Sequence, residues 1–192
     1  MRELFVWAVC ATSLAAQAVW PEFHGPKRDS VVTSRSLPLT WSEQDNVRWK
    51  VPVPGEGWSS PVVCDGRAWL TTATDSGSKL HALAVDIERG EWVHKKVVFT
   101  IDEVGHKNAL NSHASPTPVV EPGRLYVHFG TYGTACFDTE TCEEIWRRRD
   151  INCDHMEGPG SSPILVGDLL VFHVDGGDVQ YVTALDKRSG ET

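Results

Sequence analysis

The sequence lacks the patterns that mark several common classes of protein. It has no Cys-x-x-Cys pair and no Cys/His set at zinc-binding spacing, which excludes a zinc finger. The formal net charge is −8 and no cluster of Lys and Arg occurs, apart from the short run 147–149. This balance argues against a nucleic-acid partner or an anionic membrane surface. After residue 18 no apolar pattern repeats every 3.6 residues, so a helical bundle is excluded as well.

The one long apolar run lies at the N-terminus. Arg2 precedes the run 4–16, which is too short to span a bilayer comfortably. Ala16-Gln17-Ala18 has the small-residue pattern of a signal-peptide cleavage site. Residues 1–18 are therefore predicted to be a signal peptide cleaved after Ala18, with a periplasmic or secreted mature chain. No further segment is long and apolar enough to be a transmembrane segment.

Four cysteines follow the predicted cleavage site: Cys64, Cys136, Cys142 and Cys153. In an oxidising compartment they could form disulfides, and Cys136 and Cys142 are the best-placed couple because they flank one turn. Spacing alone does not establish a pairing. Four small buried thiols are the equal alternative.

A unit of short strands recurs three times. A Ser/Thr-Pro dipeptide and an apolar run begin each copy, with the prolines at Pro61, Pro118 and Pro163, 57 and 45 residues apart. Each copy continues with a turn glycine and a turn aspartate: Gly66 and Asp86, Gly123 and Asp138, Gly167 and Asp186. Repeats of 40–50 residues with four strands are typical of β-propeller blades. A β-sandwich in which Ser-Pro recurs by chance is the alternative.

The predicted fold is all-β, a β-propeller of four-stranded antiparallel blades of which about three are present. Blade 59–99 is expected to have strands at 60–64, 67–74, 79–86 and 91–99. Blade 115–149 is expected to have strands near 116–120, 124–129, 133–138 and 143–149. The incomplete blade 161–192 is expected to have three strands, at 162–166, 169–174 and 179–185.

Two segments precede the first blade. Residues 19–45 read as an irregular lead-in, because prolines and a glycine interrupt it, and Trp20 and Phe23 are expected to pack it onto the first blade. Residues 46–53 alternate between apolar and polar side chains and are predicted to be an isolated strand. Since propellers often complete their last blade with an N-terminal strand, this strand is expected to close the ring. The partial propeller is thus assigned to residues 46–192.

The aspartate turns resemble those of a known repeat. The segment 184–191, ALDKRSGE, is similar to the A-x-D-x-x-T/S-G motif of the PQQ-like (pyrroloquinoline-quinone-binding-like) propeller repeats. In that family a Trp four residues after the Gly docks against the next blade. The repeat-motif residues of this chain are Asp86, Gly90, Asp138, Trp146, Asp186 and Gly190. The copies depart from the motif at Cys142, which replaces the Gly, and at His94, which replaces the docking Trp.

The resemblance extends over the whole mature chain. The segments 20–26 and 112–118 look like those of exported bacterial PQQ-binding-like repeat proteins. It implies a quinoprotein alcohol dehydrogenase-like fold. A ring of seven or eight blades needs roughly 320–360 residues. The sequence is therefore expected to be the N-terminal fragment of a longer protein, with the remaining blades in a C-terminal region.

The resemblance leaves three functions open. The favoured one is a non-catalytic binding or scaffold module for a protein, peptide or glycan ligand. The alternatives are a PQQ- or metal-dependent oxidoreductase and a scaffold similar to an outer-membrane protein assembly factor. In the family, a quinoprotein dehydrogenase uses an Asp base, calcium ligands and a pair of adjacent cysteines, and no two cysteines are adjacent here. No catalytic residue, metal site or cofactor is assigned, and only a full-length protein could bind PQQ with calcium.

Polar residues in the loops before the innermost strands form the candidate ligand site. Such loops converge at the mouth of a propeller's channel, where they could bind a metal or a small polar ligand. The candidates are Trp58, His113, Asp154, His155 and Glu157. The alternative is that these side chains only cap their loops. Three strand histidines and two turn aspartates are expected to serve packing, the surface or turns: His81, His128, His173, Asp175 and Asp178.

Overall fold

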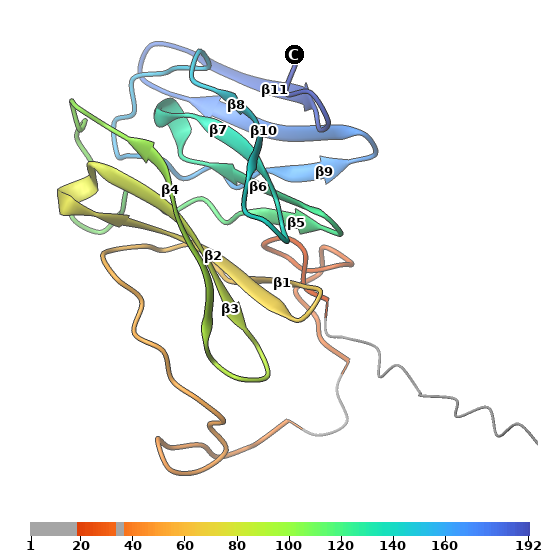
Figure 1. Cartoon of the computed structure of the whole chain (residues 1–192). Helices are drawn as coiled ribbons and strands as arrows, with labels where there is room; N and C mark the ends of the chain where they lie inside the picture. Colours follow the sequence, from red (N-terminus) through yellow and green to blue (C-terminus); the bar gives the residue numbers. More distant parts are fainter. Residues whose placement is uncertain (1–18, 34–36) are drawn as a thin grey trace, which may run out of the picture.

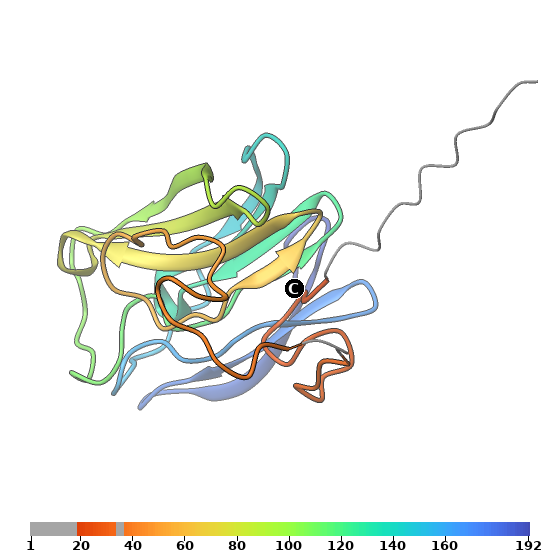
Figure 2. The same cartoon turned by 90° about the horizontal axis from the view of Figure 1, so that it is seen from below.

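The computed structural model describes residues 19–33 and 37–192, so the predicted signal peptide lies outside the described residues. The described chain forms three antiparallel sheets of four, four and three strands, which confirms the all-β fold. Figures 1 and 2 show the sheets stacked as blades, with the second between the first and the third. Within residues 19–33 and 37–192, no helix is long and apolar enough to cross a membrane.

Each blade has its strands in sequence order. Blade one contains β1 (Val62–Cys64), β2 (Arg67–Thr74), β3 (Lys79–Asp86) and β4 (Trp92–Thr100). Blade two contains β5 (Val119–Glu121), β6 (Arg124–His128), β7 (Thr134–Asp138) and β8 (Glu144–Arg148). Blade three contains β9 (Ile164–Val166), β10 (Leu169–Asp175) and β11 (Gln180–Asp186). Two short 3-10 turns, η1 (Asp75–Gly77) and η2 (Gly130–Tyr132), follow β2 and β6.

Blade two is buried on both faces, and its sequence shows why. Successive residues of a strand point to opposite faces. In β6, Leu125 belongs to a core cluster shared with blade one, while the next residue, Tyr126, belongs to the cluster shared with blade three. Trp69 anchors the first cluster and Leu170 the second. A strand buried on both faces reads as a continuous apolar run rather than an alternating one.

The Ser/Thr-Pro dipeptides link neighbouring blades. The Ser60 N–H donates to Thr117 Oγ1 at 2.9 Å, and the Thr117 N–H donates to Ser162 Oγ at 3.0 Å. Each hydroxyl therefore accepts the N–H of the preceding blade's motif. These residues bond between blades instead of within a ladder, so β1 and β5 begin later than the predicted 60–64 and 116–120.

The docking of Trp146 shows what the aspartate turn does. The indole N–H donates to the carbonyl of Lys187 at 3.0 Å, and the ring covers Gly190 so closely that a methyl group there would lie 2.7 Å from it. Gly190 also has a φ of +76°, which favours glycine. Asp186 Oδ1 accepts two backbone N–H groups of its own turn. The turn thus presents one carbonyl and one bare backbone surface to the preceding blade.

Residues 46–53 form no strand and have no ladder partner among the described residues. A strand needs a neighbouring chain to satisfy its backbone, and Pro52 lacks an N–H. Trp49 nevertheless reproduces the docking contact: its indole N–H donates to the carbonyl of Ile87 at 2.9 Å and its ring covers Gly90. Ile87 and Gly90 match Lys187 and Gly190 in the turn. The role of the segment in ring closure stays a prediction.

Blade one meets blade two through a different docking pair. His94, at the docking position, stacks on Trp69 with ring centroids 5.6 Å apart, and its buried Nε2 has no hydrogen-bond partner among the described residues. Arg67 instead donates to the carbonyl of Thr139, which is the counterpart of Ile87 in the second turn. A guanidinium therefore supplies the hydrogen bond that indole N–H groups supply in the other two turns.

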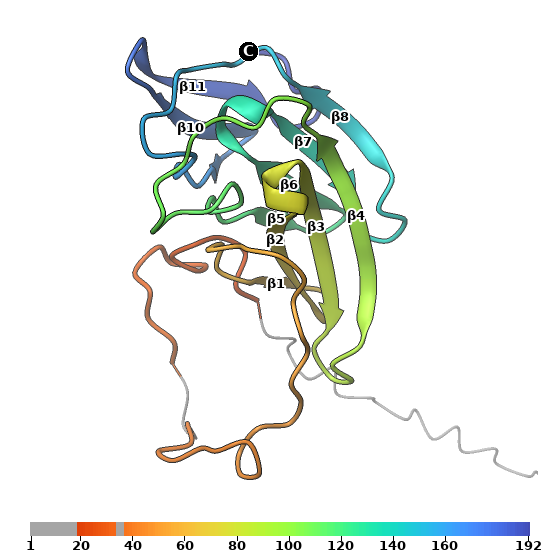
Figure 3. The same ribbon diagram turned by 90° about the vertical axis from the view of Figure 1, so that its left-hand side faces the viewer.

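The lead-in crosses the inner edges of all three blades. Trp20 pairs with Val63 through backbone bonds of 2.8 and 2.7 Å, and the carbonyl of Pro21 accepts the N–H of Val120 at 2.9 Å. Arg28 donates to the carbonyl of Leu165 and pairs with the buried Glu22 at 2.5 Å. The segment thereby covers edges that would otherwise expose unpaired backbone groups. Residues 37–57, drawn in orange, then loop out and return beside blade one (Figure 3).

Two further expectations can be compared with the structure. Phe23 is 47 % exposed, and its ring lies against that of His24. All four cysteines of the described residues are free and buried, which corresponds to the thiol alternative and not to a Cys136–Cys142 disulfide.

Candidate functional site

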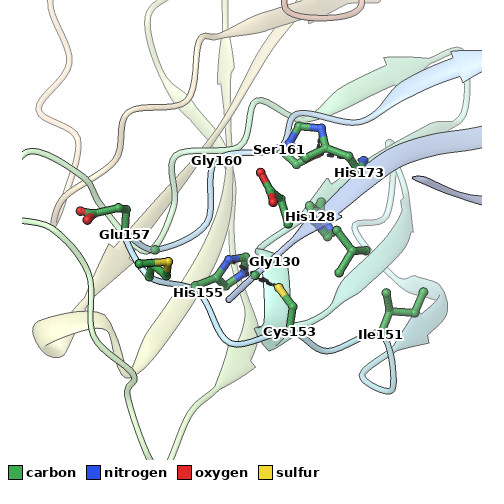
Figure 4. Close-up of a pocket in the computed structure, with 14 residues that line it drawn as sticks. His128, Gly130, Ile151, Cys153, His155, Glu157, Gly160, Ser161 and His173 are labelled. Atoms are coloured by element: carbon green, nitrogen blue, oxygen red, sulfur yellow. Dashed lines mark hydrogen bonds between the residues drawn. The ribbon is translucent and has the colours of Figure 1, made fainter. Parts of the chain in front are cut away.

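A cavity of about 260 Å³ lies at one end of blades two and three. Its walls come from the end of β6, the end of β10 and the loop 151–161 (Figure 4). Seven polar side chains line it: His128, Cys153, His155, Glu157, Ser161, His173 and Asp175. Ligand pockets for drug-sized molecules measure about 300–1,000 Å³. This cavity therefore suits a small molecule or a single side chain of a larger partner.

The repeat places two of the histidines. In the blade registers, His128 and His173 stand at the same position as Thr71 in blade one. The His173 N–H donates to Ser161 Oγ at 3.2 Å, as the Thr71 N–H donates to Ser59 Oγ at 2.9 Å. Figure 4 shows the His173 ring beside Ser161. A residue at this position of a blade therefore lies close to the loop that leads into the innermost strand.

His128 is a buried, neutral wall of the cavity. Its Nδ1 lies 2.8 Å from Thr134 Oγ1, and its ring centroid lies 4.3 Å from that of Phe172. Burial lowers the pKa of His128 to about 3, and the neighbouring His155 and His173 contribute in the same direction. The ring is therefore uncharged at neutral pH.

His155 and Cys153 lie against each other but do not form a reactive pair. His155 Nε2 accepts the Thr131 N–H at 3.0 Å, and Cys153 Sγ lies 3.6 Å from both ring nitrogens (Figure 4). Burial lowers the pKa of His155, and it raises the pKa of Cys153. A nucleophilic cysteine needs a lowered pKa and an available base. Here the thiol stays protonated and the imidazole Nε2 is already bonded to the backbone.

The five residues proposed as a shared site occupy different places. His155 and Glu157 line the cavity, and Asp154 lies beside it, where its N–H donates to Asp178 Oδ1 at 2.7 Å. His113 is buried in a separate hollow next to η1, and Trp58 is 65 % exposed and lines neither. The reason is that each loop precedes a different blade, so its side chains turn toward a different interblade space. A ligand role for all five stays a prediction.

Sequence reasoning missed part of this cavity. His128 and His173 were expected to be packing or surface residues, and Cys153 and Asp175 were not candidates, yet all four line it. Aligning the three repeats by register would have shown two histidines at one repeat position. His81, by contrast, is part-buried and bonded to Thr74 Oγ1 at 2.8 Å, in line with a packing role.

The described residues do not fit a quinone cofactor site. Across residues 19–33 and 37–192, no three His, Cys, Asp or Glu side chains converge so that they could hold a metal ion. The adjacent cysteines that the resemblance implies for a quinone clamp are missing from the sequence. No step through PQQ is therefore assigned to these residues.

Three stacked antiparallel blades, two of four strands and one of three, with a Trp docked on an Asp-containing turn, define the described chain as part of a β-propeller. Residues 102–192 match the family model described as outer membrane protein assembly factor BamB. This part of the chain is therefore similar to PQQ-like propeller repeats of the BamB type.

Solved structures show the same fold. The quinohemoprotein alcohol dehydrogenase of Comamonas testosteroni is 20 % identical, with a TM-score of 0.57 over 71 % of this chain and 20 % of that one. The quinohemoprotein alcohol dehydrogenase ADHIIG of Pseudomonas putida HK5 is also 20 % identical, with a TM-score of 0.52 over 74 % of this chain and 21 % of that one. The chain thus spans about a fifth of either structure. A search of curated proteins finds no significant match.

Proposed function

We propose that this protein is an exported PQQ-like propeller that acts as a non-catalytic binding module for a protein, peptide or glycan. The observation that carries the proposal is the cavity at the end of blades two and three, lined by polar side chains from the ends of β6 and β10 and from the loop 151–161. A pocket with a few convergent polar groups is the usual form of a binding site. The protonated Cys153 and the backbone-bonded His155 supply no activated nucleophile.

A scaffold role at the outer membrane is the second candidate. It is supported by the match of residues 102–192 to a family model named for an outer membrane protein assembly factor. A repeat propeller suits this role because its blades offer large faces and loops on a rigid frame. The two candidates differ in the partner: a membrane-protein precursor for the scaffold, and a smaller soluble ligand for the binding module.

Peptide and glycan arrays probed with the purified protein test the proposal. We expect a binder whose affinity falls at least tenfold in the double variant His155→Ala, Glu157→Ala. His81→Ala is the matched control, because His81 lies in β3 and bonds to Thr74 away from the cavity. Array hits that the cavity variant binds as well as the wild type would place the site elsewhere. Reduction of a dye with alcohols after loading with PQQ and calcium would instead support the oxidoreductase alternative.

Export has its own test. The signal peptide and the periplasmic or secreted location follow from the sequence pattern of residues 1–18. We expect N-terminal sequencing of the mature protein to begin at Val19, one residue before the backbone pairing of Trp20 with Val63. An uncleaved protein that stays in the cytoplasm would contradict export.

A further inference from the structure

Four carboxylates surround the cavity of blades two and three. Glu157 and Asp175 line it, and Asp154 and Asp178 are joined beside it by the 2.7 Å hydrogen bond. All four side chains belong to exposed residues, so they can carry their charge in water. Lys107 lies next to the loop at Gly158, but its Nζ already donates to the carbonyl of Asn111 and pairs with Glu56.

The carboxylates affect the pKa values of two titratable groups inside the cavity, His155 and Cys153. Burial lowers the pKa of His155, while Asp154, Asp175 and Asp178 act against burial and favour the protonated, positive ring. Burial raises the pKa of Cys153, and the same three carboxylates raise it further. Both effects have the sign expected where a positive charge is favoured and a negative charge is disfavoured.

The cavity wall offers an acceptor and an apolar lining. His128 is 3 % exposed, and the hydrogen bond of its Nδ1 to Thr134 leaves Nε2 without a partner among the residues described, on a ring that lines the cavity. If the proton of the neutral ring is on Nδ1, Nε2 can accept a hydrogen bond. Ile151, Met156 and Val174 add aliphatic wall. A ligand with a donor head and an aliphatic stem meets both kinds of surface.

We propose that this cavity binds a primary ammonium group on an aliphatic stem, such as the lysine side chain of a peptide partner. The proposal rests on the binding function above and names its ligand class. Carboxylates at the mouth attract the ammonium and an acceptor receives one of its hydrogens, while apolar walls bury its methylenes. The cavity volume of about 260 Å³ suits one such side chain. A carboxylate or phosphate ligand would meet four like charges.

Calorimetry with matched small probes tests the ligand class. Nα-acetyl-lysine methylamide and n-butylammonium chloride carry the ammonium charge. Nα-acetyl-norleucine methylamide has the aliphatic side chain without this charge, and Nα-acetyl-glutamate methylamide has the opposite charge. We expect the lysine probe to bind at least tenfold more tightly than the norleucine probe, and the glutamate probe not to bind. Equal affinity for lysine and norleucine, or no lysine binding at millimolar concentration, overturns the proposal.

Charge-neutral variants locate the binding. Asp175→Asn and Glu157→Gln should each lower the affinity for the lysine probe at least threefold. If Asp175→Asn fails to fold, Glu157→Gln alone tests the site. Glu88→Gln is the control, because Glu88 follows β3 in blade one, away from the cavity, and pairs with Arg48. This variant should leave the affinity for the lysine probe unchanged. Lysine binding that neither cavity variant weakens would refute the site.

The array experiment separates the two proposals. Array binders enriched in lysine would support both. Binders that depend on His155 and Glu157 but show no lysine preference would refute the ammonium ligand and leave the binding function standing. An absence of array binders together with an absence of amine binding would refute both.

Discussion

Replacing Trp146 with alanine should separate blade two from blade three. The side chain is 8 % exposed, its indole N–H donates to the Lys187 carbonyl, and its ring covers Gly190. Truncating a buried Trp to Ala typically costs about 3–5 kcal/mol, including the cavity left behind. Because this Trp lies at the blade edge, water can reach the carbonyl that it leaves free. We therefore expect Trp146→Ala to lower the free energy of unfolding by about 3–4 kcal/mol.

A second variant separates the ring from its hydrogen bond. Trp146→Phe keeps an aromatic ring over Gly190 but removes the N–H donor, so it should cost about 1–2 kcal/mol, the loss of one hydrogen bond and part of the ring area. Trp41→Ala is the control for removing an indole, because Trp41 is 70 % exposed. It should change stability by less than about 0.5 kcal/mol.

Urea unfolding followed by far-UV circular dichroism measures these differences without relying on the removed fluorophore. The slope of free energy against urea should agree among the variants, since a change would mean that the blades no longer unfold together. Hydrogen exchange should show the largest loss of protection in the turn 186–190. The reasoning fails if Trp146→Ala stays within about 1 kcal/mol of Trp41→Ala, a difference too small for a buried docking residue.

Three further perturbations test the repeat and the cavity. Trp49→Ala should lower the free energy of unfolding by about 2 kcal/mol, because Trp49 is half-buried on Gly90. If urea unfolding gave this variant the same stability as Trp41→Ala, the docking role would be contradicted. Gly190→Ala should lower the free energy of unfolding by at least about 1 kcal/mol more than Gly123→Ala. Both glycines have a positive φ, but only a methyl group at 190 would meet a ring, that of Trp146, so equal losses would refute the close contact. His128→Gln tests the buried neutral imidazole: the folded-state pKa of about 3 lies below the unfolded value near 6.5, so stability is full above pH 6.5 and falls as the pH drops toward 3. Between pH 7 and pH 4.5, the free energy of unfolding of the wild type, measured by urea unfolding, should fall by about 2–3 kcal/mol more than that of His128→Gln. Equal losses in the two proteins would argue against a neutral His128.

Much of the fold could be predicted because its signals are local. Prolines at 61, 118 and 163 mark the start of each inner strand, and glycines at 66, 123 and 167 adopt the positive φ of the turns that follow. The aspartate turns form their own hydrogen bonds within four residues, so the same short sequence makes the same turn three times. Such features need no knowledge of the rest of the chain.

The parts that sequence reasoning missed depend on neighbours distant in the chain. Residues 46–53 alternate like a strand but have no described chain to pair with, and Trp49 acts through a turn about 40 residues later. The lead-in covers the inner edges of β1, β5 and β9, which become one surface only when the blades stack.

The sequence by itself determined the strands, the turns and the repeat of this propeller, since these follow from backbone preference and side-chain alternation over a few residues. The candidate site was decided by the tertiary structure. Stacking turns each mouth loop toward its own interblade space, which separates His113 from His155. The same stacking brings His128 and His173, near the ends of β6 and β10, to the loop that carries Cys153 and Glu157. Burial and charge at this cavity arise from residues up to about 50 positions apart, and no local pattern encodes that proximity.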